Sequence, residues 1–194
     1  EVRRGDLPED AIPLARHRSK PLSLIVRDLN KYSNNFVAEQ LVKAIGAAAS
    51  GPPGSTAAGS SVLTEYLSQS GADTAGCRVV DGSGFSRDDR LSPRAIVGVM
   101  RRVLSDFGTS YEYASSLSVS GVDGTLGDRM GYAGLRGAVR AKTGLLEGVT
   151  AISGMLENLS GEEVLFSIIV NGFGCEAWRA HDLEHAVLSV AVRS

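Results

Sequence analysis

The sequence predicts an α+β fold, with helices first and an antiparallel sheet near the end of the chain. Three apolar, β-like runs follow one another at residues 137–144, 148–156 and 164–171. Asn158-Leu159-Ser160-Gly161, between the last two runs, is typical of a hairpin turn, so that pair should be antiparallel. Helical periodicity precedes and follows the runs. Consecutive antiparallel strands beside helices indicate the α+β class, with the last helix packed on the sheet.

A short polar turn separates the first two predicted helices. Apolar spacing predicts one helix from Leu22 to Asn30 and a second, about three turns long, from Phe36. Tyr32-Ser33-Asn34-Asn35 lies between them and is rich in turn and cap formers. Ser33 or Asn34 is expected to be the N-cap of the second helix. Taken alone, Ser33 is more typical of a cap than of a catalyst, although it can be both.

The middle of the chain is predicted to be irregular. Residues 47–61 are rich in Ala, Gly, Ser and Pro and are predicted to be a loop, followed by a helix at residues 61–68. Cys77-Arg78-Val79-Val80 is predicted to be a short strand. Residues 108–137 form a long loop with one short helix at 124–130, and a loop of this length in a compact domain is more often functional than idle.

Two further helices have clear signals. Ser92-Pro93 opens one of them, because serine is a good N-cap and proline is favoured at the first helical position. The other, at residues 175–192, closes the chain and is amphipathic. Its predicted apolar face carries Ala180, Leu183, Ala186, Val187 and Val190, and its predicted charged face carries Arg179, Asp182, Glu184 and Arg193.

Composition and charge exclude several classes of function. The chain has 194 residues, is 43% apolar and carries a net charge of −2, which fits one ordinary domain with its own core. It has no basic stripe that would indicate nucleic acid, and no apolar run of the roughly 18 residues that a membrane span needs. His181 and His185 lack a third ligand, so no metal or other cofactor is expected. Cys77 and Cys175 allow one bridge or two buried thiols.

The first β-like run carries residues suited to binding a carboxylate. The ammonium of Lys142 attracts an anion, the hydroxyl of Thr143 donates to it, and Gly144 lets a substrate backbone lie close to the strand. For this triplet alone, the alternative is an edge strand whose solvated lysine discourages aggregation. Ser33-Asn34-Asn35, a Ser-x-Asn sequence in the turn between two helices, precedes it.

Ser-x-x-Lys, Ser-Asp-Asn and Lys-Thr-Gly form the motif set of penicillin-recognising serine enzymes, and two of the three elements occur here in the expected order. Together with the stretches Leu29–Leu41, Asp81–Arg87 and Gly121–Leu126, they make the chain resemble the C-terminal part of the class C, low-molecular-mass penicillin-binding proteins. Those proteins are D-alanyl-D-alanine carboxypeptidases and endopeptidases that trim bacterial peptidoglycan. The resemblance extends roughly from Leu22 to Gly172.

The resemblance implies a penicillin-binding/β-lactamase-like transpeptidase fold, present here in part, and a role for each motif residue. Ser33 would relay a proton to the leaving D-alanine nitrogen, with Lys142 beside it to assist. Asn35 would hydrogen-bond the peptide carbonyl of the substrate. Thr143 would bind the terminal carboxylate, and the N–H of Leu145 would form half of the oxyanion hole.

The chain departs from the family pattern at two points. Leu145 follows Gly144 where the family commonly has Ser or Thr, so a carboxylate-binding hydroxyl is lost and the preference for carboxypeptidase over endopeptidase activity is less defined. No serine has a lysine three positions later. Without that nucleophile and base no acyl-enzyme can form, so a separate N-terminal part carrying Ser-x-x-Lys is the expected partner. Residues 1–20 are then a lead-in from a preceding segment, and residues 21–194 the C-terminal portion of one split catalytic domain.

The favoured function is therefore a serine D-Ala-D-Ala carboxypeptidase or endopeptidase. It would act on peptidoglycan stem peptides through an acyl-enzyme, be inhibited by β-lactams, and work only with its N-terminal part. Its substrate implies export to the periplasm or the extracellular cell-wall space. One alternative is a catalytically inactive module that binds peptidoglycan or regulates, holding stem peptides on the Lys142 strand. Another is a serine β-lactamase fragment, for which the spacing leaves Glu39 open as a deacylating carboxylate.

Overall fold

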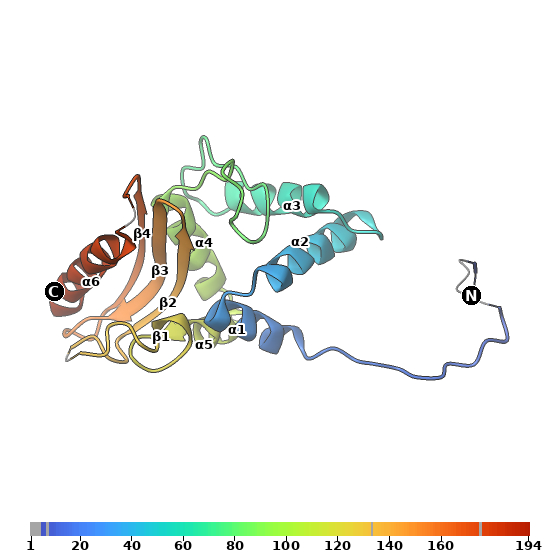
Figure 1. Ribbon diagram of the computed structural model, residues 1–194, viewed down its shortest axis with the longest axis horizontal. Coiled ribbons are helices and arrows are strands. Elements are labelled where there is room, and N and C mark those ends of the chain that lie inside the picture. Colours follow the sequence, from blue (N-terminus) through green and yellow to red (C-terminus); the bar gives the residue numbers. More distant parts are fainter. Residues whose placement is uncertain (1–4, 7, 133, 175) are drawn as a thin grey trace.

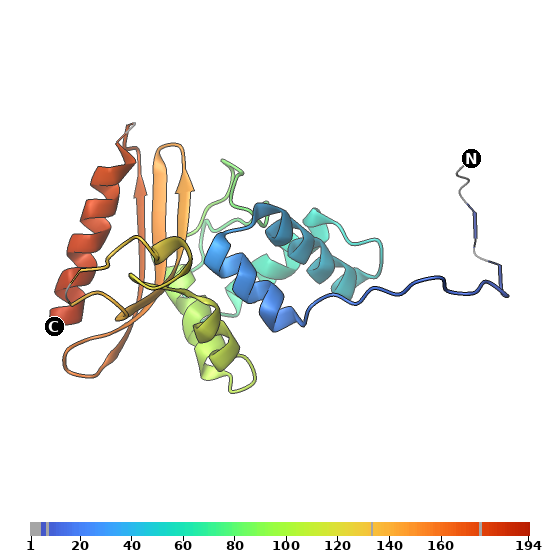
Figure 2. The same ribbon diagram turned by 60° about the horizontal axis from the view of Figure 1, so that its bottom comes forward.

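The computed structural model describes residues 5–6, 8–132, 134–174 and 176–194. Residues 8–20 form no helix or strand and extend away from the body of the molecule (Figures 1 and 2). The elements that follow, in chain order, are α1 (Leu22–Tyr32), α2 (Asn35–Ser50), α3 (Thr56–Ser68), α4 (Pro93–Ser105), α5 (Ser110–Ser116), β1 (Ser118–Val119), the 3-10 helix η1 (Gly124–Leu126), β2 (Val139–Leu146), β3 (Val149–Glu157), β4 (Glu163–Asn171) and α6 (Ala177–Arg193).

The four strands form one antiparallel sheet in the order β1-β2-β3-β4. β2 and β3 pair along their whole length, with Lys142 opposite Ser153 and Gly144 opposite Ala151. The α+β class, the three predicted strands and the hairpin turn after β3 are confirmed. β1 was not predicted, because two residues are too few to show an alternating pattern.

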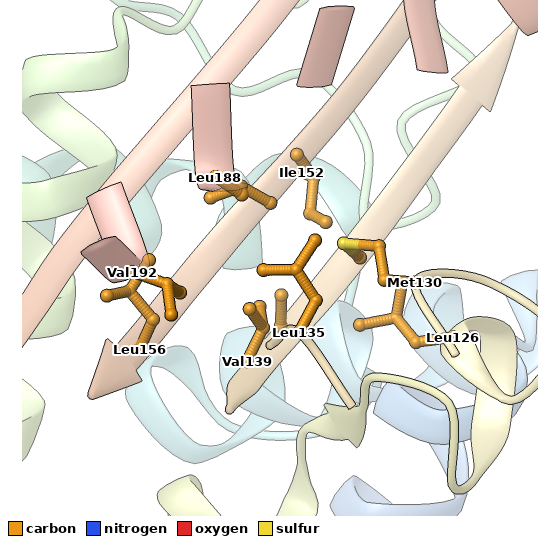
Figure 3. Close-up of a cluster of buried hydrophobic side chains, with 9 residues drawn as sticks. Leu126, Met130, Leu135, Val139, Ile152, Leu156, Leu188 and Val192 are labelled. Atoms are coloured by element: carbon orange, nitrogen blue, oxygen red, sulfur yellow. The ribbon is translucent and has the colours of Figure 1, made fainter. Parts of the chain in front are cut away.

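Helices cover both faces of the sheet, with α6 on one side and α4 on the other (Figures 1 and 2). Alternate residues of β3 are buried, as expected for a strand that presents one face to a helix. The main core fills the space between the sheet and α6 and is closed by the segment after η1 (Figure 3). Its buried members are Leu126, Met130, Leu135, Val139, Ala141, Ile152, Leu156, Leu188 and Val192.

The face of α6 that packs on the sheet differs from the prediction. Its buried residues recur every fourth position, at Ala180, Glu184, Leu188 and Val192. Glu184, predicted on the charged outer face, is 0% exposed. The Arg129 guanidinium lies 2.8 Å from one of its carboxylate oxygens and the Thr150 hydroxyl donates to the other at 3.0 Å. These partners compensate for the burial of the charge, so the outward placement was wrong.

The prediction of a loop at residues 47–61 was wrong except for residues 51–55, which lie between two helices. α2 continues to Ser50, and α3 begins at Thr56 with the Ser55 hydroxyl accepting from the Ala58 N–H at 3.1 Å. The small residues in this region allow two helices to approach closely. A Cβ on Gly59 would lie 2.0 Å from the carbonyl oxygen of Val42, so only glycine fits there. The Ala- and Gly-rich composition therefore reflects helix packing rather than a loop.

Two other parts of the middle region differ from the prediction. Residues 77–80 are not a strand, and only Arg78 pairs, in an isolated bridge with Arg90. The long segment at residues 108–137 contains α5 and β1, and its predicted helix is reduced to the three residues of η1. Ser and Tyr have weak helix propensity, which hides α5 in the sequence. Cys175 lies outside the described residues, so its pairing with Cys77 stays open.

Candidate functional site

Ser33 lies at the junction between α1 and α2, and the side chain that caps α2 is that of Asn34 rather than that of Ser33. It ends α1 in the left-handed region, at φ 54° and ψ 51°, where its N–H donates to the Leu29 carbonyl at 2.7 Å. Asn34 is the N-cap of α2, since its side-chain oxygen accepts from the Val37 N–H at 3.0 Å. Residues other than glycine rarely adopt this conformation, and such residues often mark functional sites.

Lys142 on β2 contacts Ser33 directly. Its Nζ donates to Ser33 Oγ at 2.8 Å, joining two residues that are 109 positions apart, and it also donates to the carbonyl of Thr143. The lysine is half-buried, and this burial lowers its pKa because the ammonium loses hydration. The neutral amine is therefore easier to form than in an exposed lysine, which suits a group that gives up and regains a proton.

The end of β2 offers an open strand edge beside this pair. β1 contacts β2 only at Arg140 and Ala141, and no other strand of the described residues covers the rest of that edge. Gly144 and Leu145, which follow Lys142 and Thr143, are exposed. An extended peptide can add to such an edge through its main-chain groups.

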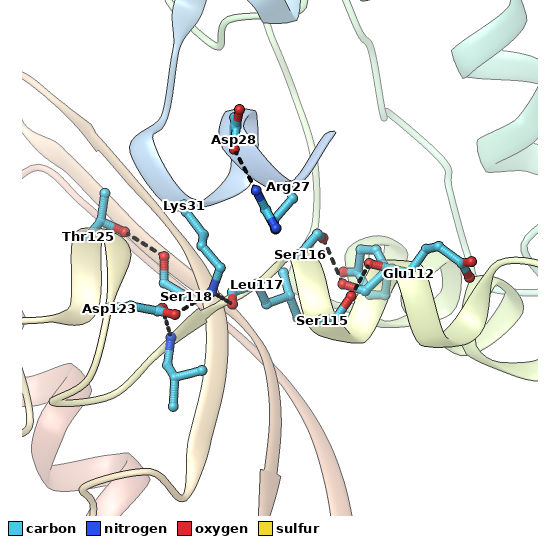
Figure 4. Close-up of polar contacts among 12 residues, drawn as sticks. Arg27, Asp28, Lys31, Glu112, Ser115, Ser116, Leu117, Ser118, Asp123 and Thr125 are labelled. Atoms are coloured by element: carbon cyan, nitrogen blue, oxygen red, sulfur yellow. Dashed lines mark hydrogen bonds and ion pairs between the residues drawn. The ribbon is translucent and has the colours of Figure 1, made fainter. Parts of the chain in front are cut away.

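The segment Leu117–Leu126, here called the bridging segment, lies beside the end of α1 and contacts it through Lys31 (Figure 4). Lys31 Nζ donates to Asp123 Oδ2 at 2.6 Å and to the Leu117 carbonyl at 2.9 Å. The other oxygen of Asp123 accepts from the Val119 N–H at 2.9 Å. Partial burial opposes ionisation of Asp123, but the hydrogen bonds from Lys31 and Val119 outweigh it, and its pKa is lowered. Because Lys31 lies two residues before Ser33, these bonds hold the end of α1.

The bridging segment reaches the strand through Thr125. Thr143 Oγ1 donates to Thr125 Oγ1 at 2.8 Å, and Ser118 Oγ lies 3.4 Å from the same Thr125 oxygen. A single segment therefore contacts the helix end that carries Ser33 and the strand that carries Lys142.

Glu39, left open by the sequence as a deacylating carboxylate, supports the turn at residues 81–86. Its Oε1 accepts from the N–H groups of Gly82 and Ser83 at 3.0 and 2.9 Å. Arg87, just after this turn, donates to the Glu147 carbonyl at 2.8 Å and so connects the turn to the β2–β3 hairpin. In these contacts Glu39 has a structural role, because its carboxylate holds the turn against α2.

The structure brings some of the predicted site residues together more tightly than others. Ser33, Lys142 and Thr143 form one hydrogen-bonded cluster with Thr125. Asn35 is the exposed first residue of α2, and its side chain is absent from the polar contacts found within the described residues.

Sequence reasoning assigned no role to Lys31, Asp123 or Thr125. Gly121–Leu126 was noticed only as part of the family resemblance, and an ion pair 92 positions apart leaves no local pattern. The histidines of α6 lie away from this cluster. There, the Arg129 guanidinium contacts His185 Nε2 at 3.2 Å, so this ring nitrogen faces a cation.

Comparison with known proteins gives concordant matches. Residues 1–192 match the D-Ala-D-Ala carboxypeptidase 3 (S13) family. The D-alanyl-D-alanine carboxypeptidase of Actinomadura sp. (strain R39) is 39% identical over 180 residues, covering 89% of this chain and 33% of that protein. The D-alanyl-D-alanine carboxypeptidase DacB of Haemophilus influenzae is 30% identical over 168 residues, covering 86% of this chain and 35% of that protein.

Solved structures agree with these relatives. Penicillin binding protein 4 (dacB) from Haemophilus influenzae superimposes with a TM-score of 0.85 at 27% identity, over 97% of this chain and 43% of that one. A predatory endopeptidase from Bdellovibrio bacteriovorus, with a TM-score of 0.71 and 20% identity over 96% of this chain and 48% of that one, shares the fold.

The chain thus spans about a third of the length of the curated relatives it matches. The family match nevertheless covers nearly every residue present, including the Ser33–Lys142 cluster. The resemblance drawn from the motifs and the α+β fold are both confirmed at this level. The chain belongs to the D-Ala-D-Ala carboxypeptidase 3 (S13) family.

Proposed function

We propose that this chain is the C-terminal portion of the catalytic domain of a serine D-Ala-D-Ala carboxypeptidase or endopeptidase. The enzyme acts on peptidoglycan stem peptides through an acyl-enzyme and is acylated by β-lactams. The observation that carries the proposal is the 2.8 Å contact between Lys142 Nζ and Ser33 Oγ, in a chain of a carboxypeptidase family. A solved relative, penicillin binding protein 4 from Haemophilus influenzae, is known in complex with a β-lactam.

The contact suggests how a proton reaches the leaving group. Ser33 Oγ accepts a hydrogen bond from Lys142, so its own O–H points elsewhere and is free to donate. As the peptide bond breaks, Ser33 gives this proton to the D-alanine nitrogen, and Lys142 replaces it. The lowered pKa of Lys142 favours that second transfer.

The remaining motif residues bind and orient the peptide. The open edge of β2 pairs with the substrate backbone, and Thr143 donates to the terminal carboxylate. The N–H of Leu145 is one oxyanion-hole donor, and loss of such a donor costs a factor of about 10²–10³ in rate. Asn35, exposed at the start of α2, hydrogen-bonds the peptide carbonyl.

The attacking serine and its base belong to an N-terminal part. This chain contains no Ser-x-x-Lys, and the curated relatives are about three times as long as the stretch it matches. We interpret residues 1–20 as a lead-in from a preceding segment and residues 21–194 as the C-terminal portion of one split domain. The substrate places the enzyme in the periplasm or the extracellular cell-wall space.

Fluorescent penicillin tests the proposal. A protein that includes the N-terminal part should be labelled covalently. The 194-residue chain alone should not be, nor should a variant with alanine at the serine of Ser-x-x-Lys. If the completed, folded protein stays unlabelled but binds stem peptides, the inactive binding module is the better description. Rapid catalytic turnover of nitrocefin would instead indicate a β-lactamase.

A further inference from the structure

We propose that Thr125 is a substrate-binding residue that, together with Thr143, binds the terminal carboxylate of the peptide. In this chain Thr125 supplies the hydroxyl that the family commonly has after the Lys-Thr-Gly glycine and that Leu145 lacks. The inference rests on the proposed function and deepens it, because it names the chemical group that this part of the site recognises.

The hydroxyl groups are arranged for this role. Thr143 Oγ1 donates to Thr125 Oγ1 at 2.8 Å, and both residues are half-buried. A threonine hydroxyl carries one proton, so in this arrangement the proton of Thr143 is engaged with Thr125, whereas Ser118 Oγ is the acceptor within reach of the Thr125 proton among the described residues. The other neighbour of Thr125, Ser118 Oγ, lies 3.4 Å away, at the long limit of a hydrogen bond. A carboxylate only accepts hydrogen bonds, so both threonine hydroxyls can turn to donate to it.

Thr125 is also held in place before any ligand arrives. Gly124, next to it, has φ +58°, and a Cβ there would lie 2.3 Å from Ser118 Oγ and 2.8 Å from the Lys31 carbonyl oxygen. On the other side, Leu126 is fully buried in the main core. Since η1 is fixed at both ends, binding requires little further ordering of the Thr125 side chain.

The charges near Thr125 favour an anion. The ammonium of Lys142, next to Thr143 in sequence, contributes positive charge. The nearest carboxylate in the bridging segment, Asp123, is paired with Lys31 at 2.6 Å, so its negative charge is compensated. Leu145 has a 66% exposed side chain and no hydroxyl, so β2 alone offers only the Thr143 hydroxyl.

The test compares hydroxyl variants in the protein completed by its N-terminal part. Thr125→Val removes the hydroxyl and keeps the shape, Thr125→Ser keeps the hydroxyl, and Thr64→Val on α3 is the control. The substrates are an N-acylated D-Ala-D-Ala peptide and its C-terminal amide. Because hydrogen bonds to charged groups are among the stronger ones, we expect Thr125→Val to raise KM for the acid about ten- to one-hundred-fold. Thr125→Val should change KM for the amide little. Thr125→Ser and Thr64→Val should change KM for the acid little.

A rescue variant strengthens the comparison. Leu145→Thr in the Thr125→Val background should restore most of the affinity for the acid, because it returns a hydroxyl to the end of β2. The inference would be overturned if Thr125→Val raised KM equally for the acid and the amide, or if Thr125→Ser raised KM for the acid as much as Thr125→Val does. It would also be overturned if the rescue variant failed to restore affinity although its melting temperature matched that of the wild type. If the completed wild-type protein neither cleaves the acid nor binds penicillin, the proposed function itself is contradicted. An active wild type that Thr125→Val matches contradicts only the role of Thr125.

Discussion

Ser33 keeps its hydroxyl available because Asn34 takes over the capping of α2. Had Ser33 been the N-cap, its oxygen would accept from a backbone N–H of the next helix. Lys142 would then compete for the same oxygen atom. Instead, Ser33 is the left-handed residue that ends α1, and its hydroxyl oxygen accepts the hydrogen bond from Lys142 Nζ.

Lys142→Ala tests the proton relay at this pair. In the completed protein the substitution should slow acylation by fluorescent penicillin by about 10²-fold or more, the usual effect of a positioned proton-transfer group. Stability should change little, because the lysine is only half-buried and its burial disfavours its charge. Lys43→Ala, at an exposed position on α2, is the matched control. Labelling of Lys142→Ala at the wild-type rate would count against the assigned role.

Sequence reasoning reached Ser33 and Lys142 because each belongs to a short motif with its own local context. It gave no role to Thr125 or to the Lys31–Asp123 pair. Their partners are distant in sequence, and a single threonine or aspartate carries no local signal. Such contacts become visible only when the fold brings the bridging segment to the end of α1.

At the scale of elements, apolar periodicity located β2, β3, β4 and most helices but misjudged how α6 packs. Counting apolar residues selected the face with Leu183 and Val187, whereas the buried stripe includes Glu184. The error is physical, since a carboxylate can be buried when partners satisfy it. Those partners, Arg129 and Thr150, come from other elements, so the sequence of the helix alone could not reveal the stripe.

Arg129→Met tests the buried pair. Removing the guanidinium leaves the Glu184 carboxylate buried without its counter-ion, and the free energy of unfolding should fall by about 3–5 kcal/mol in urea denaturation. The double variant Arg129→Met/Glu184→Gln removes both charges and keeps an acceptor for Thr150, so it should recover most of that loss. Lys20→Met, which breaks an exposed pair with Asp28, should have little effect. A double variant no more stable than Arg129→Met would contradict this account.

The histidines of α6 predict a dependence of stability on pH. Burial, followed by the nearby Arg129 guanidinium, lowers the pKa of His181 and His185 below the ordinary 6.5, while Glu184 and Asp182 partly oppose the shift. Between the lowered pKa and 6.5 the unfolded chain binds protons that the folded chain does not. The contribution of these two histidines to the free energy of unfolding should therefore be complete above about pH 6.5 and should decrease as the pH falls below that value.

Urea midpoints between pH 7.5 and pH 5 would measure this loss. His185→Gln keeps an acceptor for Arg129 and should reduce the decrease. His17→Gln, in the exposed lead-in, should leave it unchanged. A decrease of equal size in all three proteins would show that other groups cause it.

At the scale of the whole molecule, the site lies where the helical part and the sheet meet, and the bridging segment ties the two together. The order of β2, β3, β4 and most helices was predictable because those elements are long enough to show their own period, whereas β1 and α5 are too short. The way the two parts meet depends on side-chain contacts between distant residues. None of the described helices is long and apolar enough to span a membrane.

The exposed side of α6 gives a prediction about the proposed N-terminal part. Leu183, Val187 and Val190 are 52%, 46% and 70% exposed and follow helical spacing, so they form an apolar stripe on the surface. If the domain is split as we propose, the N-terminal part should cover this stripe. Leu183→Lys/Val190→Lys should then weaken its association when the two parts are expressed as separate chains and co-purified.

The same substitutions should hardly affect the 194-residue chain alone. Exposed positions usually change the free energy of unfolding by no more than about 0.5 kcal/mol, so its urea midpoint should stay close to that of the wild type. Asp182→Lys, on an exposed position of the same helix, separates the effect of added charge from the loss of apolar surface. If the double variant associates as well as Asp182→Lys does, the stripe is not the surface on which the N-terminal part packs.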